Sequence, residues 1–178
     1  MNFKADFLIK QLKRSPDGIA VEIGCLRHHE EDVDDGFSTY HLCRNCVSMG
    51  KTFYSFDNEI TNVNMANTVL REHGLPLVVQ CQDGSRALSE LSNISFLFLD
   101  SSMEESLPQF NNANLVPNAI VIVDDFNQIG EYPNGKATEI VKVLSEKQIP
   151  FTKHSMCYND ACCMLLFTLP NGKPHGTL

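Results

Sequence analysis

The chain has 178 residues, of which 43% are hydrophobic and 20% are charged, and its formal net charge is −8. This length is typical of a single domain with a sizeable core, and no apolar run approaches the ~20 residues of a membrane span. Because an acidic chain opposes binding to a phosphate backbone, we expect a cytoplasmic protein that acts on a small molecule and binds neither nucleic acid nor a membrane.

The chain alternates amphipathic segments with short apolar runs. In chain order the predicted elements are helix 2–14, strand 19–23, helix 38–49, strand 52–56, helix 63–73, strand 77–81, helix 85–91, strands 94–100 and 118–125, helix 136–147, and strands 151–157 and 161–169. Such alternation is typical of an α/β domain with a mainly parallel sheet. The tight turn at 158–160 predicts a hairpin, so the final strand runs antiparallel. We therefore predict a Rossmann-like sheet of seven strands with helices on both faces.

Two of the seven cysteines, Cys43 and Cys46, form a C-x-x-C inside a predicted helix. Three-residue spacing places both on one helix face, so we interpret them as buried thiols. The alternative is a zinc site completed by His28, His29 or His41.

Acidic residues stand at or near the ends of successive predicted strands. They are Glu22, Asp57, Asp83, Asp100 and Asp124. Because the carboxyl ends of the strands line the ligand crevice of an open α/β sheet, we expect these acids to gather at one site. For any single acid, capping of the next helix is the alternative.

Two features around the first strands are typical of nucleotide-cofactor binding. Asp57 follows Gly36 by 21 positions, close to the ~20 at which an acid accepts ribose hydroxyls. Gly24 lets the chain pass close beneath a cofactor, where a Cβ would collide. Dehydrogenases and methyltransferases share both features, so these residues do not separate the two classes.

An acidic stretch, HHEEDVDD at 28–35, separates VEIG from GFST. A run this acidic opposes the pyrophosphate of NAD or FAD. We predict a lid over cofactor or acceptor, with His28 and His29 able to face the reaction. A solvated loop without a role is the alternative.

Six short segments carry a family resemblance. In chain order they are VEIG, GFST, FYSFD, CQDG, FLFLD and IVIVDDF. With the closing hairpin, they resemble the class I S-adenosylmethionine-dependent methyltransferases. The segments LDSSMEESL and VDDFNQIGEYPNGKATEIVKVL are most similar to metal-dependent O-methyltransferases related to macrocin O-methyltransferase. On this basis residues 1–178 form one domain, with an N-terminal helix (1–17), a cofactor-binding core (18–169) and a tail (170–178).

The resemblance implies roles for individual residues. The methionine part of the cofactor would lie beside Glu22 and Gly24, the ribose on Asp57, and the adenine at Asp83 and Gly84. The implied cofactor-binding set is Glu22, Gly24, Gly36, Ser38, Asp57, Asp83, Gly84 and Asp100.

The resemblance also implies a metal site. Asp100, Asp124 and Asp125 would hold Mg²⁺ or another divalent cation, which suits an all-oxygen donor set. Such a cation can bind two acceptor hydroxyls and lower the pKa of one of them. The implied activity is O-methylation of a small hydroxylated acceptor, with Asp100, His28 and His29 as catalytic candidates.

The sequence departs from the family pattern in two places. Ser102 stands where the family usually has a second acid that acts as base, so the base would be His28, His29 or His154, or the metal alone would suffice. Gly24 and Gly36 lie 12 positions apart, whereas the family turn is short. A weak or inactive cofactor-binding protein and a nucleotide-dependent oxidoreductase are the alternative functions, and homo-oligomerisation stays open.

Overall fold

The computed structural model describes residues 3–29, 37–129, 132–155 and 163–172. In chain order its elements are α1 (Phe3–Leu12), β1 (Ile19–Ile23), α2 (Ser38–Met49), β2 (Phe53–Asp57), α3 (Ile60–Glu72), β3 (Val79–Cys81), α4 (Gly84–Glu90), β4 (Ile94–Leu99), α5 (Met103–Asn112), β5 (Leu115–Val123), β6 (Phe126–Ile129), β7 (Tyr132–Gly135), α6 (Thr138–Glu146), β8 (Phe151–Ser155) and β9 (Cys163–Leu169). The elements shared with the sequence prediction begin and end within a few residues of the predicted positions.

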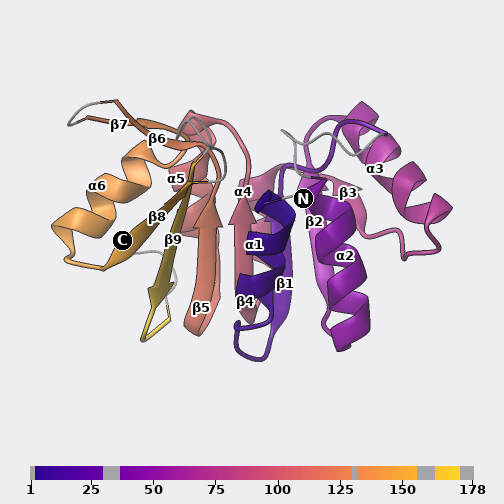
Figure 1. Cartoon of the computed structure of the whole chain (residues 1–178), viewed down its shortest axis with the longest axis horizontal. Coiled ribbons are helices and arrows are strands. Elements are labelled where there is room, and N and C mark those ends of the chain that lie inside the picture. Colours follow the sequence, from indigo (N-terminus) through magenta and orange to yellow (C-terminus); the bar gives the residue numbers. More distant parts are fainter. Residues whose placement is uncertain (1–2, 30–36, 130–131, 156–162, 173–178) are drawn as a thin grey trace.

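Seven strands form one sheet in the order β3-β2-β1-β4-β5-β9-β8 (Figure 1). The first five strands pair in parallel, and β9 runs antiparallel to both β5 and β8. The predicted Rossmann-like sheet with an antiparallel final strand is therefore confirmed. A separate antiparallel ribbon joins β6 to β7.

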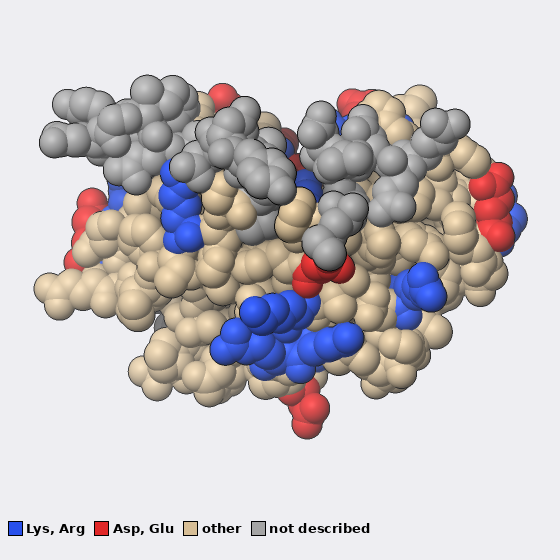
Figure 2. Space-filling view, viewed as in Figure 1, with Lys and Arg blue, Asp and Glu red and all other residues tan. Residues whose placement is uncertain are grey.

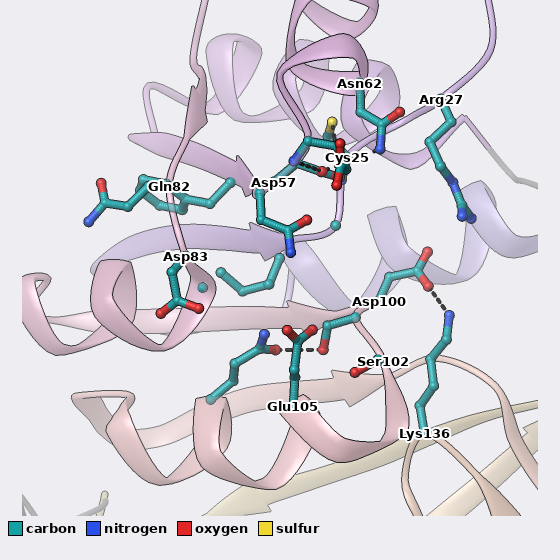
Figure 3. A pocket seen from close by; sticks show the side chains of 18 residues that line it. Cys25, Arg27, Asp57, Asn62, Gln82, Asp83, Asp100, Ser102, Glu105 and Lys136 are labelled. Carbon is teal, nitrogen blue, oxygen red and sulfur yellow. Dashed lines mark hydrogen bonds and ion pairs between the residues drawn. The ribbon is translucent and has the colours of Figure 1, made fainter.

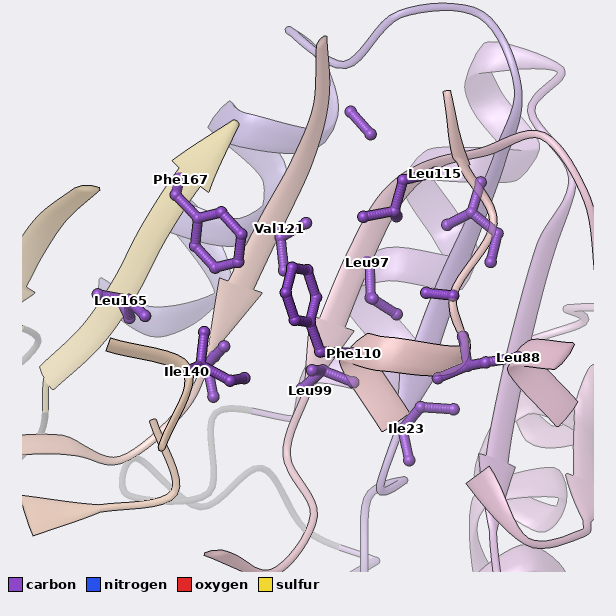
Figure 4. Packing of buried hydrophobic residues seen from close by; sticks show 14 of the residues in the cluster. Ile23, Leu88, Leu97, Leu99, Phe110, Leu115, Val121, Ile140, Leu165 and Phe167 are labelled. Carbon is purple, nitrogen blue, oxygen red and sulfur yellow. The ribbon is translucent and has the colours of Figure 1, made fainter. Parts of the chain in front are cut away.

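The sheet is covered on both faces, and each face has its own apolar core. One cluster packs the sheet against α4, α5 and α6 (Figure 4), and the other packs it against α1, α2 and α3. Strand β4 serves both cores, because Leu97 belongs to the first cluster whereas Phe96 and Phe98 belong to the second. Alternation of side chains across a strand explains why this segment is a continuous apolar run.

Helix α5 is absent from the sequence prediction. Its sixth residue is Pro108, which removes a backbone donor and disfavours a helix interior. Tertiary packing outweighs that local preference, because Phe110 is fully buried and its ring centroid lies 5.3 Å from that of Phe167. The β6–β7 ribbon was also not predicted, and the hairpin turn at 158–160 lies outside the described residues.

The C-x-x-C pair lies on one buried face of α2, as predicted. Cys43 and Cys46 are both fully buried free thiols, and burial raises the pKa of Cys43 to about 11 and that of Cys46 to about 12. Across the described residues, neither thiol belongs to a group that could hold a metal ion. The zinc alternative is thereby disfavoured.

None of the helices in the described part of the chain is both long enough and apolar enough to cross a bilayer. On the face that carries α1, Lys and Arg side chains gather in one group near the lower end of that helix (Figure 2). Lys10, Lys13 and Arg14, in the last turn of α1 and just after it, are exposed. This group lies away from the carboxyl ends of the parallel strands.

Candidate functional site

A cavity of about 500 Å³ opens at the carboxyl ends of the first four strands (Figure 3). The chain leaves β1 toward one edge of the sheet and leaves β4 toward the other, which is where open α/β sheets bind ligands. Five of the eight predicted cofactor-binding residues line the cavity, namely Gly24, Asp57, Asp83, Gly84 and Asp100. Of the five strand-end acids, Asp57, Asp83 and Asp100 therefore gather at the cavity, whereas Glu22 and Asp124 do not line it.

Gly24 follows β1 directly and has a φ of +87°, a conformation that favours glycine. A Cβ on this residue would lie 2.4 Å from the carbonyl oxygen of Asp100. The backbone N–H of Gly24 donates to the carbonyl of Phe56 at 2.8 Å. The glycine thus allows the ends of β1 and β4 to approach closely beneath the cavity.

Asp57 ends β2, and its carboxylate is oriented by groups of the protein itself. Oδ1 accepts the backbone N–H of Glu59 at 2.8 Å and the side-chain amide of Asn62 at 3.3 Å. Oδ2 accepts the backbone N–H of Cys25 at 3.2 Å. Oδ2 also accepts the thiol of Cys25 at 3.6 Å. Each carboxylate oxygen has two lone pairs, so a hydroxyl group of a ligand would have to replace the thiol, a weak donor, or the long bond from Asn62.

Asp83 and Gly84 form the third side of the cavity, at the start of α4. Asp83 accepts the backbone N–H of Arg86 at 2.8 Å, so it caps the helix and lines the cavity at once. A Cβ on Gly84 would lie 2.6 Å from Cγ2 of Ile23 and 2.8 Å from Nε2 of Gln109. The glycine therefore lets α4 pack closely against β1 and α5.

Glu22 and Ser38, two of the predicted cofactor-binding residues, are not on the cavity wall. The carboxyl of Glu22 is fully buried and receives hydrogen bonds from Ser38 Oγ at 2.6 Å, Thr39 Oγ1 at 2.8 Å and Ser55 Oγ at 2.6 Å. Burial raises the pKa of Glu22 to about 7, although the three hydroxyl bonds oppose the shift. This residue joins β1, β2 and the start of α2 behind the cavity. Gly36 lies outside the described residues.

The three acids predicted to hold a metal do lie together. One oxygen each of Asp100, Asp124 and Asp125 lies within 4.8 Å of the others. Two lysines bind these same carboxylates. Lys4 Nζ donates to Asp124 Oδ2 at 2.6 Å and to Asp100 Oδ2 at 3.5 Å. Lys136 Nζ donates to Asp100 Oδ1 and lies 2.8 Å from Asp125 Oδ2.

The electrostatics of the cluster follow from burial and from these lysines. Burial acts to raise the pKa of Asp100, but Lys4 and Lys136 outweigh it and the pKa is lowered. Burial, together with the neighbouring Asp100, raises the pKa of Asp124 to about 6. The oxygen donors are those that Mg²⁺ prefers, but ammonium groups already pair with both oxygens of Asp100 and with one oxygen each of Asp124 and Asp125. A resident divalent cation does not fit this arrangement.

The histidines predicted as bases lie elsewhere. His28 and His29 are exposed, and Nε2 of His29 lies 2.8 Å from Oε2 of Glu72 on α3. The ring of His154 lies 4.6 Å from that of Phe7. None of the described histidines lines the cavity. The proposed lid, 28–35, lies mostly outside the described residues.

Several cavity residues were not predicted from the sequence. Arg27, Glu105 and Lys136 all reach the wall near Asp100 (Figure 3). One signal was available for Lys136, because a lysine two residues before a helix is unfavourable beside the positive end of the helix dipole. The same signal marks Lys4, the second residue of α1. A lysine in such a position needs an acidic partner.

Comparison with known proteins gives no match by sequence: neither a protein-family model nor a curated protein matches the chain. Solved structures do match by fold. A putative O-methyltransferase from Klebsiella pneumoniae superposes with a TM-score of 0.64 at 14% identity, over 93% of this chain and 80% of that chain. Magnesium protoporphyrin IX methyltransferase from Synechocystis PCC 6803, solved with bound S-adenosylmethionine, gives 0.62 at 16% identity, over 93% and 78%. The chain has the fold of these methyltransferases.

A third structure of similar fold is named for a different activity. It is a precorrin 8w decarboxylase from Methanobacterium thermoautotrophicum, with a TM-score of 0.62 at 18% identity over 93% of this chain and 89% of that chain. At such identities the likeness is one of fold, and function has to be argued from the site.

Proposed function

We propose that the chain is an S-adenosylmethionine-dependent methyltransferase that methylates an oxygen atom of a small hydroxylated molecule. The observation that carries the proposal is Asp57, whose carboxylate is oriented by backbone donors at the carboxyl end of β2 on the cavity wall. In this position it would accept the two ribose hydroxyls of the cofactor. The fold shared with a methyltransferase that binds S-adenosylmethionine supports the proposal.

The rest of the cavity suits a cationic methyl donor. With the ribose on Asp57, the adenine would lie toward Asp83 and Gly84 and the methionine part toward Gly24, as the resemblance implies. The acidic residues on the wall attract a sulfonium cation, whereas the pyrophosphate of NAD would meet the same charges unfavourably. The cavity volume of about 500 Å³ lies in the range of small-molecule binding sites.

Methyl transfer needs mainly in-line positioning of the reactants, which can lower the activation free energy by ~7 to 11 kcal/mol. The acceptor oxygen attacks the methyl carbon, the carbon–sulfur bond breaks, and sulfur keeps the electron pair. Because none of the described histidines lines the cavity, Glu105 is the carboxylate that we propose to take the acceptor's proton. Cation assistance is not part of this proposal, because ammonium groups hold the oxygens of the carboxylate cluster.

A protein that binds the cofactor without turnover is the second candidate. Ser102, which stands where the resemblance implies a catalytic acid, is the observation that favours it. Detection of methylated product from any hydroxylated acceptor would exclude this candidate.

The test of the proposal is calorimetric titration with S-adenosylhomocysteine, S-adenosylmethionine and NAD. We expect the first two to bind, and we expect Asp57→Ala to weaken the binding of S-adenosylhomocysteine. Loss of a charged acceptor costs on the order of 1.5 to 3 kcal/mol per hydrogen bond, so the affinity should fall at least about tenfold. Asp57→Asn keeps the shape and one acceptor oxygen and should give an intermediate loss.

Asp17→Ala is the matched control, because Asp17 is exposed and lies outside the cavity wall. Its affinity for S-adenosylhomocysteine should equal that of the parent. Unchanged affinity in a folded Asp57→Ala variant would contradict the assignment of Asp57. Binding of NAD in place of S-adenosylhomocysteine would contradict the proposed activity.

A further inference from the structure

The carboxylate cluster is built from parts of the chain that lie far apart in sequence. Asp100 follows β4, and Asp124 and Asp125 follow the neighbouring strand β5. Lys4 reaches the cluster from α1, 96 positions before Asp100 and 120 before Asp124. Lys136 reaches it from the segment between β7 and α6. Five separate residues therefore converge at one end of the cavity.

The two lysines pair with four of the six carboxylate oxygens of the cluster. Both oxygens of Asp100 are bonded, Oδ2 by Lys4 and Oδ1 by Lys136. Oδ2 of Asp124 pairs with Nζ of Lys4, and Oδ2 of Asp125 pairs with Nζ of Lys136. Mg²⁺ would have to bind oxygens of these same carboxylates at ~2.0 to 2.1 Å. It would either share these carboxylates with two ammonium groups, whose positive charge repels it, or displace those groups.

Burial makes this displacement unfavourable. The side chains of Lys4 and Lys136 are only 10% and 21% exposed, and that of Asp100 is 9% exposed. An ammonium group taken from its carboxylate partners in such surroundings loses its compensation for desolvation. Nζ of Lys4 also lies 5.5 Å from the centre of the Phe98 ring, in cation–π geometry. The two positive charges are thus held by the fold.

We propose that Lys4 and Lys136 take the place of a divalent cation in this cluster, so that the methyl transfer proposed above proceeds without a metal. The inference rests on the proposed function. It concerns the charges at the end of the cavity where the methyl acceptor would bind. Lys136 lines the cavity together with Asp100 (Figure 3). It is a positioning residue, because it fixes Asp100 at the wall where the acceptor would enter.

The inference is tested by thermal unfolding in the presence of millimolar MgCl₂, compared with NaCl at equal ionic strength. The midpoint of the parent should be the same in both salts. Lys136→Met frees oxygens of Asp100 and Asp125, so its midpoint should be lower without Mg²⁺ and should rise as Mg²⁺ is added. A saturating cation should give a rise on the order of 5 °C.

Two further lysine variants serve as controls. Lys136→Arg keeps the positive charge and should remain insensitive to Mg²⁺. Lys142→Met removes an exposed lysine of α6 that pairs with Glu139 at 2.6 Å, and it should behave as the parent does. A loss of stability alone would not produce a response to Mg²⁺, so the response separates replacement of a cation from a merely structural role.

Two outcomes would overturn the inference. One is a parent whose midpoint rises with Mg²⁺, and the other is a Lys136→Met variant that stays insensitive to it. If Lys136→Met does not fold, electron paramagnetic resonance of Mn²⁺ added to the parent decides the question, because stoichiometric binding contradicts the inference and its absence supports it. Calorimetry with S-adenosylhomocysteine in the same buffers tests the proposed function separately, since a parent can bind that ligand whether or not it binds a cation.

Discussion

Replacement of Gly24 by alanine is expected to lower the free energy of unfolding by about 2 to 6 kcal/mol, the sum of backbone strain and overpacking at ~1 to 3 kcal/mol each. The strain arises because Gly24 has a φ of +87°. The overpacking arises because the new Cβ would lie 2.4 Å from the carbonyl oxygen and 2.9 Å from the carbonyl carbon of Asp100. Backbone atoms cannot rotate away as a flexible side chain can, so the ends of β1 and β4 would have to separate.

Gly74→Ala is the matched control for this variant. Gly74 has a φ of +67°, and a Cβ there would meet nothing within 4 Å, so only the strain of about 1 kcal/mol should appear. Urea unfolding of both variants measures the difference. Because Gly24 also lines the cavity, its replacement should weaken S-adenosylhomocysteine binding, whereas Gly74→Ala should not. Equal losses of stability in the two variants would show that contact with Asp100 is unimportant.

The sheet could be predicted because its sequence signals are local. Buried parallel strands are short apolar runs bounded by polar residues, and such runs identify β1, β2, β4 and β5 without reference to the rest of the chain. Helix α5 could not be predicted in this way, because its local signal at Pro108 argues against a helix. Its stability comes from Phe110, whose partner Phe167 lies 57 positions further along the chain.

The candidate site was predicted in part for the same reason. Strand-end acids converge because parallel strands end at one edge of the sheet, so Asp57, Asp83 and Asp100 could be placed from the strands alone. Glu22 could have been separated from them by strand periodicity. Its neighbours Val21 and Ile23 pack against the helices of one face, so Glu22 must point to the other, toward α2.

The lysines of the cluster could not be placed from spacing. Lys4 lies on the first helix, and the acids that it binds follow the fourth and fifth strands. No rule of sequence separation connects them, because their proximity depends on how α1 packs across the sheet. The acids alone indicated a site for positive charge, and only the folded chain shows that its own lysines supply that charge.

The free energy of unfolding is expected to depend on pH through Glu22. Burial raises the pKa of Glu22 in the folded protein from an ordinary value of 4.5 to about 7. Between these two values the folded state retains a proton that the unfolded state has lost, so stability decreases as the pH rises. The contribution is fully present below pH 4.5 and is lost above about pH 7, and it amounts to about 3 kcal/mol at ~1.36 kcal/mol per pKa unit.

Glu22→Gln isolates this effect, because the amide has nearly the same shape and stays neutral at every pH. Its hydrogen bonds with Ser38, Thr39 and Ser55 can be kept, since a hydroxyl can both donate and accept. Asp124, whose pKa is also raised, is present in both proteins, so its contribution cancels in the difference between them. The variant should therefore gain stability relative to the parent as the pH rises, by about 3 kcal/mol at most.

Urea unfolding of both proteins at about pH 5 and about pH 8 measures this difference. The control is Glu104→Gln, which changes an exposed acid in the first turn of α5 and should leave the pH dependence of the parent unaltered. A Glu22→Gln variant whose stability differs from that of the parent by the same amount at both pH values would mean that Glu22 is ionised in the folded protein. The three hydroxyl groups around Glu22 would then stabilise a buried carboxylate rather than a carboxylic acid.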